Sequence, residues 1–192
     1  MIRAIIFDCF GVLTTDGWLP FKAKYFGHDP ALFDQAGALN SQTNIGVVSY
    51  TDFLTAISEM SAKSPGEVDR EISNNVPNAE LFAYIKQLNA SYKIGMLSNA
   101  SDDWMSDLFE PSQTALFDVI ALSYEMKFTK PMAEAYATVA ERLNVEVDEC
   151  VFIDDQERYI TGAQEAGMQA IWYKDFAQLK AELSQLLADT KN

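Results

Sequence analysis

The chain has 192 residues, a length typical of one domain or of one domain that carries an insertion. Apolar residues make up 48% of the sequence and charged residues 22%, values that exclude a disordered or fibrous protein. Its 28 acidic and 14 basic residues give a formal net charge of −14, which argues against binding to nucleic acid or to an anionic membrane.

The cysteines and the N-terminal residues indicate the compartment. Cys9 and Cys150 are too few for a disulfide framework or a four-thiolate metal site, and each is expected to be a buried free thiol. The first apolar run is interrupted by Asp8, so it is too short for a signal-peptide core or a membrane span. We therefore expect a cytoplasmic protein.

Five short apolar runs predict the strands of a sheet. They are rich in Ile, Val and Phe and lack polar alternation, which is typical of parallel strands covered on both faces. The runs are Ala4–Phe7, Tyr92–Leu97, Asp118–Leu122, Cys150–Ile153 and Gln169–Trp172. Apolar residues at helical spacing separate most of them, in sets that begin at Leu81, Met132 and Phe176. Alternating strands and helices predict an α/β fold with a doubly wound parallel sheet.

One long segment breaks this alternation. More than eighty residues separate the first two runs, far more than a single crossover needs. Helical patterns over Asp29–Leu39 and Tyr50–Met60, and a capping box at Ser64–Glu67, predict a small helical cap inserted after the first strand. Its position beside the carboxyl ends of the strands suits a lid over a ligand site. The predicted boundaries are residues 15–77 for the cap and residues 1–14 and 78–192 for the core.

Polar residues follow the predicted strands at the edge where such sheets bind ligands. They are Asp8, Ser98 with Asn99, Lys130, and Asp154 with Asp155. Taken singly, two of these signals have local explanations. Asp8 could simply begin a turn. Ser98 could cap the helix expected from about Asp102, a role for which Ser101 competes.

The lysine and the acidic pair are harder to explain as local structure. Lys130 precedes Pro131 at a predicted helix start, where it cannot accept bonds from free N–H groups and where its charge opposes the helix dipole. Asp154 and Asp155 repel each other at the end of a buried run unless a cation is near. Both features favour a functional site. The alternatives are a solvated lysine and an Asp that only caps the following helix.

The four signals together carry a resemblance to a known family. The motifs FDxxGVL, LSN, KP and FIDDxxxxIxGAxxAGM, in this order, resemble those of the haloacid dehalogenase superfamily over nearly the whole chain. The chain is most similar to the phosphatase branch that includes bacterial glucose-1-phosphatase-type enzymes and the N-terminal phosphatase domain of soluble epoxide hydrolase. The resemblance implies a Rossmann-like core and a Mg²⁺-dependent phosphatase that acts on a small phosphorylated metabolite.

The resemblance also implies a nucleophile and a metal site. Asp8 would attack the phosphorus and form an aspartyl-phosphate. Mg²⁺ would be held by Asp8, Asp155 and the backbone carbonyl of Phe10, with Asp154 supporting the metal shell.

Three further residues would bind the phosphate. Ser98 and the backbone N–H of Asn99 would hold phosphate oxygens. Lys130 would offset the negative charge on the phosphate and on the nucleophile. On so acidic a chain, this lysine and the metal ion would be the main attraction for the substrate.

One position departs from the family pattern D-x-D-G-[TV]. Phe10 replaces the second Asp, which usually protonates the leaving group. The change favours two alternatives: a 2-haloacid dehalogenase, or a catalytically weak module that binds a phosphorylated ligand. Dehalogenases lack the paired carboxylates, so Asp154 and Asp155 favour the phosphatase. Trp18 and Tyr25 could contact a substrate or could pack inside the cap; neither the substrate nor the oligomeric state is predicted.

Overall fold

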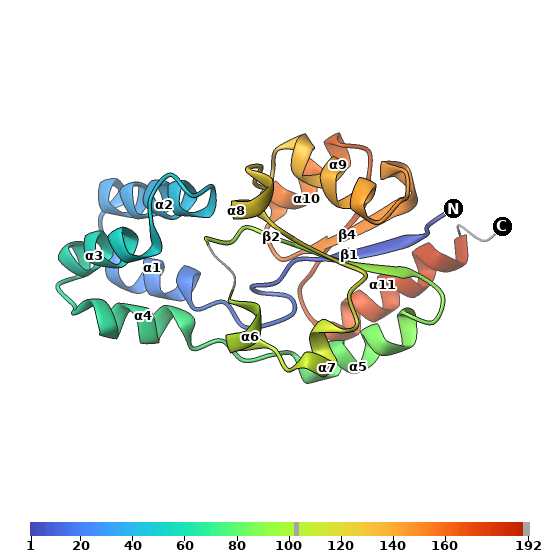
Figure 1. Cartoon of the computed structure of the whole chain (residues 1–192), viewed down its shortest axis with the longest axis horizontal. Coiled ribbons are helices and arrows are strands. Elements are labelled where there is room, and N and C mark those ends of the chain that lie inside the picture. Colours follow the sequence, from blue (N-terminus) through green and yellow to red (C-terminus); the bar gives the residue numbers. More distant parts are fainter. Residues whose placement is uncertain (102–103, 190–192) are drawn as a thin grey trace.

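A five-stranded parallel sheet forms the centre of the larger part of the molecule (Figure 1). In this computed structural model, which describes residues 1–101 and 104–189, the strand order is β3-β2-β1-β4-β5. The strands are β1 (Ala4–Phe7), β2 (Lys93–Ser98), β3 (Val119–Leu122), β4 (Cys150–Asp154) and β5 (Gln169–Trp172). Each lies within one residue of the bounds expected from the sequence. The predicted α/β fold with a doubly wound parallel sheet is confirmed.

Helices cover both faces of the sheet (Figure 1). On one face lie α5 (Ala79–Leu88) and α11 (Phe176–Asp189); on the other lie α9 (Ala133–Arg142) and α10 (Glu157–Glu165). Successive side chains of β1 point to opposite faces, so Ile5 and Phe7 join the first core and Ala4 and Ile6 join the second. All four are fully buried, which explains why the run is apolar without alternation.

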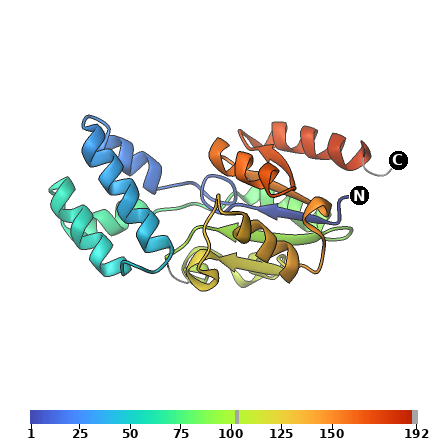
Figure 2. The ribbon, with the colours of Figure 1, turned by 90° about the horizontal axis from the view of Figure 1, so that it is seen from above.

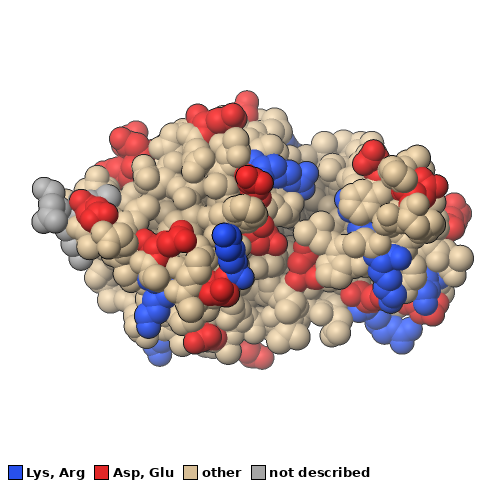
Figure 3. Space-filling model, turned by 180° about the vertical axis from the view of Figure 1, so that it is seen from behind, with Lys and Arg blue, Asp and Glu red and all other residues tan. Residues whose placement is uncertain are grey.

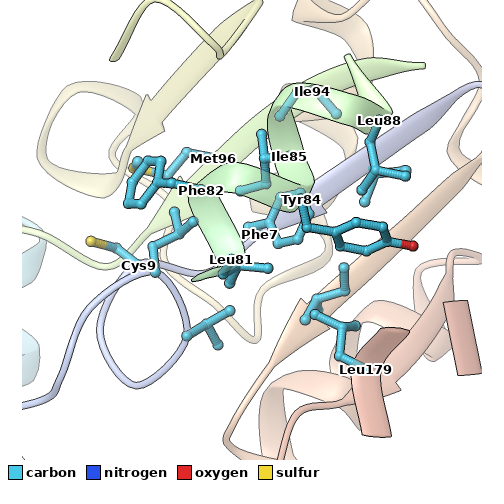
Figure 4. Packing of buried hydrophobic residues seen from close by; sticks show 14 of the residues in the cluster. Phe7, Cys9, Leu81, Phe82, Tyr84, Ile85, Leu88, Ile94, Met96 and Leu179 are labelled. Atoms are coloured by element: carbon cyan, nitrogen blue, oxygen red, sulfur yellow. The ribbon is translucent and has the colours of Figure 1, made fainter. Parts of the chain in front are cut away.

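The first of these cores is built where α5 lies against β1 (Figure 4). Leu81, Ile85 and Leu88 recur on one face of the helix and pack near Phe7 and Ile94 of the sheet. Asn78 caps this helix by accepting the N–H of Leu81 at 3.1 Å. The helix therefore starts directly after the chain returns from the inserted segment.

Four short elements were not predicted. They are α6 (Met105–Leu108), α7 (Pro111–Thr114), α8 (Ser123–Met126) and the 3-10 helix η1 (Val147–Glu149). Each is a single turn, too short to show a period of 3.6 residues. No helix within residues 1–101 and 104–189 is both long and apolar enough to span a membrane.

A separate group of helices lies at one end of the sheet, drawn in blue to teal (Figure 2). It comprises α1 (Trp18–Phe26), α2 (Pro30–Asn44), α3 (Tyr50–Ser61) and α4 (Pro65–Ser73). These helices pack around their own buried cluster, which includes Phe21, Phe26, Phe53, Ile57 and Val68. Asp29 and Ser49 cap α2 and α3, and the capping box at Ser64 and Glu67 is present. The first helix was not predicted; Asp16 begins it by accepting the N–H groups of Trp18 and Leu19.

Two chain segments link this helical group to the sheet, and they are hydrogen-bonded to each other. The N–H of Thr15 donates to the carbonyl of Val76 at 3.1 Å, and the N–H of Val76 donates to the hydroxyl of Thr15 at 2.9 Å. A third contact joins the two parts elsewhere, where the hydroxyl of Ser123 donates to the carbonyl of Asn44 at 2.5 Å. The linking segments are therefore joined to each other at Thr15 and Val76, and the end of α2 is joined to α8 by the contact between Asn44 and Ser123.

Candidate active site

The sheet brings Asp8, Ser98 and Asp154 to one edge. Asp8 directly follows β1, whereas Ser98 and Asp154 are the last residues of β2 and β4. Both of those strands pair with β1 in parallel, so the three carboxyl ends lie side by side. The N–H of Asp8 donates to the carbonyl of Ile153 at 2.8 Å, which fixes the nucleophile candidate beside the end of β4.

Lys130 lies between two of these carboxylates. Its Nζ is 2.6 Å from Oδ1 of Asp8 and 2.7 Å from Oδ2 of Asp154, and its side chain is only 1% exposed. The expectation that Lys130 stands at a helix N-cap is wrong, because the N-cap of α9 is Met132. The lysine instead turns inward, where it is a buried counter-ion and not a solvated side chain.

The third carboxylate completes an acidic cluster. Oxygens of Asp8, Asp154 and Asp155 all lie within 4.8 Å of one another. Oδ1 of Asp155 is buried and has no hydrogen-bond partner in the part of the chain that the structure describes. Asp154 does not cap α10 directly; its Oδ1 accepts the N–H of Gln156, the N-cap residue, at 2.8 Å.

Charge in this cluster is not balanced. Burial and the neighbouring Asp154 raise the pKa of Asp8 well above its ordinary value. Burial, Asp154 and Asp16 together raise the pKa of Asp155 to about 6. Burial acts against the charged form of Lys130, but Asp154 and Asp8 outweigh it and raise its pKa, so the ammonium stays protonated. One ammonium thus faces three carboxylates.

A hard divalent cation fits this arrangement. Several carboxylate oxygens within a few ångströms, one of them buried and unpaired, are the donor set that Mg²⁺ prefers. Gly11 keeps the space open, because a Cβ there would lie 2.3 Å from Oδ2 of Asp155. Asp8 and Asp155, two of the predicted ligands, are thus brought together; the carbonyl of Phe10 stays a prediction as the third.

Ser98 ends β2 at the same edge of the sheet and lines the cleft. Its side chain is fully buried, yet its hydroxyl has no hydrogen-bond partner among the described residues. A buried hydroxyl without a partner is costly unless something binds it. Ser98 is a strand residue, and the next described helix, α6, begins only at Met105. The helix start expected at Asp102 lies outside the described residues.

The side chain of Asn99 has a role that the sequence did not reveal. Its Oδ1 accepts the backbone N–H of Lys130 at 2.9 Å, and its Nδ2 donates to the carbonyl of Lys130 at 3.1 Å and to the hydroxyl of Tyr159 at 3.2 Å. Asn99 therefore clamps the backbone of the buried lysine. Residues 99 and 130 are 31 positions apart, so sequence spacing gave no signal.

A cleft of about 940 Å³ opens between the helical group and the sheet and reaches Asp8. On one face of the molecule the surface is indented between these two parts, and acidic side chains are spread over both (Figure 3). Phe10 and Trp104 form part of the cleft wall, with ring centroids 4.8 Å apart. Trp18 also lines the cleft, whereas Tyr25 lies outside it and donates its hydroxyl to Glu71 at 3.0 Å.

The family model described as haloacid dehalogenase-like hydrolase matches residues 2–167 of the chain. The chain belongs to this family. The resemblance expected from the motifs FDxxGVL, LSN, KP and FIDDxxxxIxGAxxAGM is thereby confirmed, and the protein is a hydrolase of the haloacid dehalogenase-like type.

This hydrolase is similar to a phosphatase and to a magnesium- and phosphate-binding enzyme of the same family. Phosphatase MT3486 of Mycobacterium tuberculosis is 27% identical over an alignment of 187 residues that covers 88% of this chain and 86% of the phosphatase. A Bacteroides thetaiotaomicron enzyme of the same family, bt-2542, was solved in complex with magnesium and inorganic phosphate. It is 27% identical, has a TM-score of 0.73, and the match covers 93% of this chain and 99% of that one.

An L-2-haloacid dehalogenase from Xanthobacter autotrophicus, solved with chloropropionic acid covalently bound, shares the fold. Its TM-score is 0.67 at 18% identity, and the match covers 96% of this chain and 83% of that one.

Several cleft residues of this haloacid dehalogenase-like hydrolase were not singled out in the sequence. They are Asp16, Lys22, Arg158 and Tyr159. Arg158 and Tyr159 occupy variable positions of the motif FIDDxxxxIxGAxxAGM, and Asp16 and Lys22 lie in a segment for which the sequence predicted no element. All four line the cleft, and the sequence alone does not show this because it depends on the folded structure.

Proposed function

We propose that this hydrolase is a Mg²⁺-dependent phosphatase that acts on a small phosphorylated metabolite, with Asp8 as the nucleophile. The observation that carries the proposal is the placement of Lys130 within 2.7 Å of both Asp8 and Asp154, at the sheet edge where the buried hydroxyl of Ser98 has no partner among the described residues. The magnesium and phosphate bound by the Bacteroides relative, and the phosphatase from Mycobacterium, support the same reading.

The first chemical step is attack by Asp8 on phosphorus. Lys130 holds one carboxylate oxygen of Asp8, which leaves the other free to attack. The bond from Asp8 to phosphorus forms as the ester oxygen–phosphorus bond breaks, and the ester oxygen departs as an alkoxide or phenoxide that takes a proton from water. Water then attacks the phosphorus of the aspartyl-phosphate, releases inorganic phosphate and restores the carboxylate.

The surrounding residues orient the phosphoryl group. Ser98 donates its hydroxyl to a phosphoryl oxygen, and the N–H of Asn99 donates to another. Lys130 offsets the negative charge that gathers on the phosphoryl oxygens. The Asn99 side chain keeps the lysine backbone in place for this role.

Asp8, Asp155 and the carbonyl of Phe10 would hold Mg²⁺, and Asp154 would support that shell. When bound, the cation would lower the repulsion between the phosphate and the three carboxylates. Residues 15–77 would serve as a cap, which excludes water from the cleft and contacts the part of the substrate that is not transferred.

Phe10 limits which esters are hydrolysed well. Phenylalanine cannot donate a proton, and a general acid typically contributes a factor of roughly 10² to 10⁴. Esters with a good leaving group depend least on such an acid. We therefore expect aryl phosphates to be better substrates than alkyl phosphates.

A second candidate is a 2-haloacid dehalogenase. The apolar pair of Phe10 and Trp104 in the cleft wall favours it, because a carbon–halogen bond suits an apolar wall better than a phosphate does. Against it stands the crowding of Asp8, Asp154 and Asp155, which a metal-independent reaction does not need.

The two functions are separated by one assay pair. The protein is incubated with an aryl phosphate with and without magnesium, and in parallel with 2-chloropropionate in a chelator. Release of phosphate that requires magnesium and disappears in Asp8→Asn supports the phosphatase. Release of chloride without a divalent cation would support the dehalogenase, and binding of phosphate with no turnover of either compound would indicate a binding module.

A further inference from the structure

Two cations face the cleft from opposite sides. Lys22 belongs to α1 of the helical group and Arg158 to α10 beside the sheet, and both line the cleft. Neither has a carboxylate oxygen within 4.0 Å anywhere in residues 1–101 and 104–189. Burial, and then the charge of Arg158, lower the pKa of Lys22, so each lies within the electrostatic reach of the other.

Neutral groups fix the position of both side chains. The ammonium of Lys22 lies 3.7 Å from the centroid of the Phe33 ring. Arg158 donates to the side-chain oxygen of Gln156 at 3.0 Å and to the hydroxyl of Tyr159 at 2.6 Å. Two like charges that are oriented without a counter-ion repel each other, and an anion between them would remove that repulsion.

Carboxylates in the cleft form no ion pair with these two cations among the described residues. Asp16 accepts backbone N–H groups at the start of α1, and Asp69 accepts the hydroxyl of Tyr50 at 2.7 Å. Asp34 acts on Lys22 from a distance and partly offsets its charge.

Arg158 also stands close to the proposed phosphate site. The Nζ of Lys130 lies 4.8 Å from the centroid of the Tyr159 ring, and the Cζ of Arg158 lies 4.4 Å from the same centroid. The two cationic groups are therefore at most about 9 Å apart. A single small molecule can reach both.

We propose that Lys22 and Arg158 form a second anion-binding subsite, and that the substrate is a phosphate monoester with a second anionic group, a carboxylate or a second phosphate. This inference rests on the proposed phosphatase function. Because one cation comes from the cap and the other from the core, an anion that bridges them also draws the cap onto the core. Binding of the correct substrate thus closes the cleft.

The test compares two aryl phosphates that differ in one charge. The first is 4-carboxyphenyl phosphate, and the second is its neutral isostere, 4-carbamoylphenyl phosphate. Charge-assisted hydrogen bonds predict a kcat/KM about tenfold to a hundredfold higher for the carboxylate, mainly through a lower KM. Lys22→Gln or Arg158→Gln should reduce this ratio toward one, and Arg158→Lys should restore part of it. A phosphonate in place of the carboxylate decides whether the second anion is carboxylate-like or phosphate-like.

The control variants each remove one positive charge outside the cleft. Lys24 shares α1 but pairs with Glu71 at 2.5 Å, and Arg142 of α9 pairs with Glu125 at 3.9 Å. Neither lines the cleft, so Lys24→Gln and Arg142→Gln should leave the ratio unchanged. A ratio of one in the unaltered protein, or a preference that survives both Lys22→Gln and Arg158→Gln, would overturn the subsite.

Binding of non-hydrolysable analogues separates this inference from the proposed function. Calorimetry with 4-carboxybenzylphosphonate and 4-carbamoylbenzylphosphonate measures the same preference without turnover. Tighter binding of the carboxylate with no hydrolysis of either phosphate would support the subsite and refute the phosphatase. Hydrolysis of both phosphates together with equal binding of both phosphonates would refute the subsite and leave the phosphatase standing.

Discussion

The ammonium of Lys130 lies 2.6 Å from a carboxylate oxygen of Asp8, and both side chains are buried. Removal of one partner from a buried ion pair leaves an uncompensated charge, which typically costs about 3–5 kcal/mol. Lys130→Met should therefore lower the free energy of unfolding by about this amount and abolish phosphatase activity. Urea unfolding in the absence of magnesium measures the stability change.

A second substitution tests the cause of that loss. In the Lys130→Met background, Asp8→Asn removes one of the charges left without a partner and should recover part of the stability, although not the activity. Lys174→Met, an exposed lysine outside the cleft, is the control and should change little. A Lys130→Met protein as stable as the unaltered one would contradict the buried ion pair.

Magnesium should stabilise the protein more at pH 7 than at pH 5. The pKa of Asp155 is raised to about 6 in the folded protein, above its ordinary value near 4. Between these values the folded state holds a proton that the unfolded state lacks, so without metal the stability contributed by this group increases as the pH falls from about 6 to about 4. Magnesium needs the ionised form and competes with that proton.

Thermal unfolding with and without millimolar magnesium checks this expectation. The increase in Tm should be clear at pH 7 and small at pH 5, and Asp155→Asn should remove most of the difference. An equal shift at both pH values, or none at either, would argue against a metal held by these carboxylates.

Gly11 is expected to tolerate no side chain. Its φ of +91° is a conformation that other residues rarely adopt, and a Cβ would lie 2.3 Å from Oδ2 of Asp155. Gly11→Ala should lower stability by roughly 1–3 kcal/mol and should weaken magnesium binding by displacing that carboxylate. Gly66→Ala is the control, because a Cβ there meets nothing within 4 Å. Urea unfolding and magnesium titration follow both variants.

Phe10→Asp should change the range of esters hydrolysed. An Asp at this position could protonate the leaving alcohol, so turnover of alkyl phosphates should rise toward the factor of roughly 10² to 10⁴ that a general acid contributes. Turnover of aryl phosphates should rise less, because their leaving groups need little protonation. Kinetics with matched alkyl and aryl esters measure both effects. Equal effects on the two classes would mean that protonation of the leaving group does not limit the reaction.

The sheet and most helices of the helical group could be predicted from the sequence because each signal is local. A fully buried parallel strand such as Ala4–Phe7 is apolar throughout. The capping box at Ser64–Glu67, which begins α4, is a motif of four residues. Helix α1 escaped prediction because its buried residues, Phe21 and Phe26, are five positions apart and do not repeat at helical spacing. The one-turn helices are shorter than any detectable period.

The candidate site likewise contains residues that local sequence signals placed and contacts that only the fold creates. Asp8, Ser98 and Asp154 could be placed at one edge because each ends or follows a parallel strand. The inward turn of Lys130 and its clamp by Asn99 could not, since they depend on how a loop packs against a strand 31 residues away. For the same reason nothing in the sequence indicated that Lys22 and Arg158 line the same cleft.

The proposed mechanism requires that Asp8 is phosphorylated during turnover. Protein quenched with acid while it hydrolyses an aryl phosphate in magnesium is digested with trypsin, and the peptide of residues 4–22 is analysed by tandem mass spectrometry. One added phosphoryl group is expected on Asp8 and none in the Asp8→Asn variant. Turnover with a phosphoryl group on Asp16 or another residue, or full activity of Asp8→Asn, would contradict the assignment of Asp8 as the nucleophile.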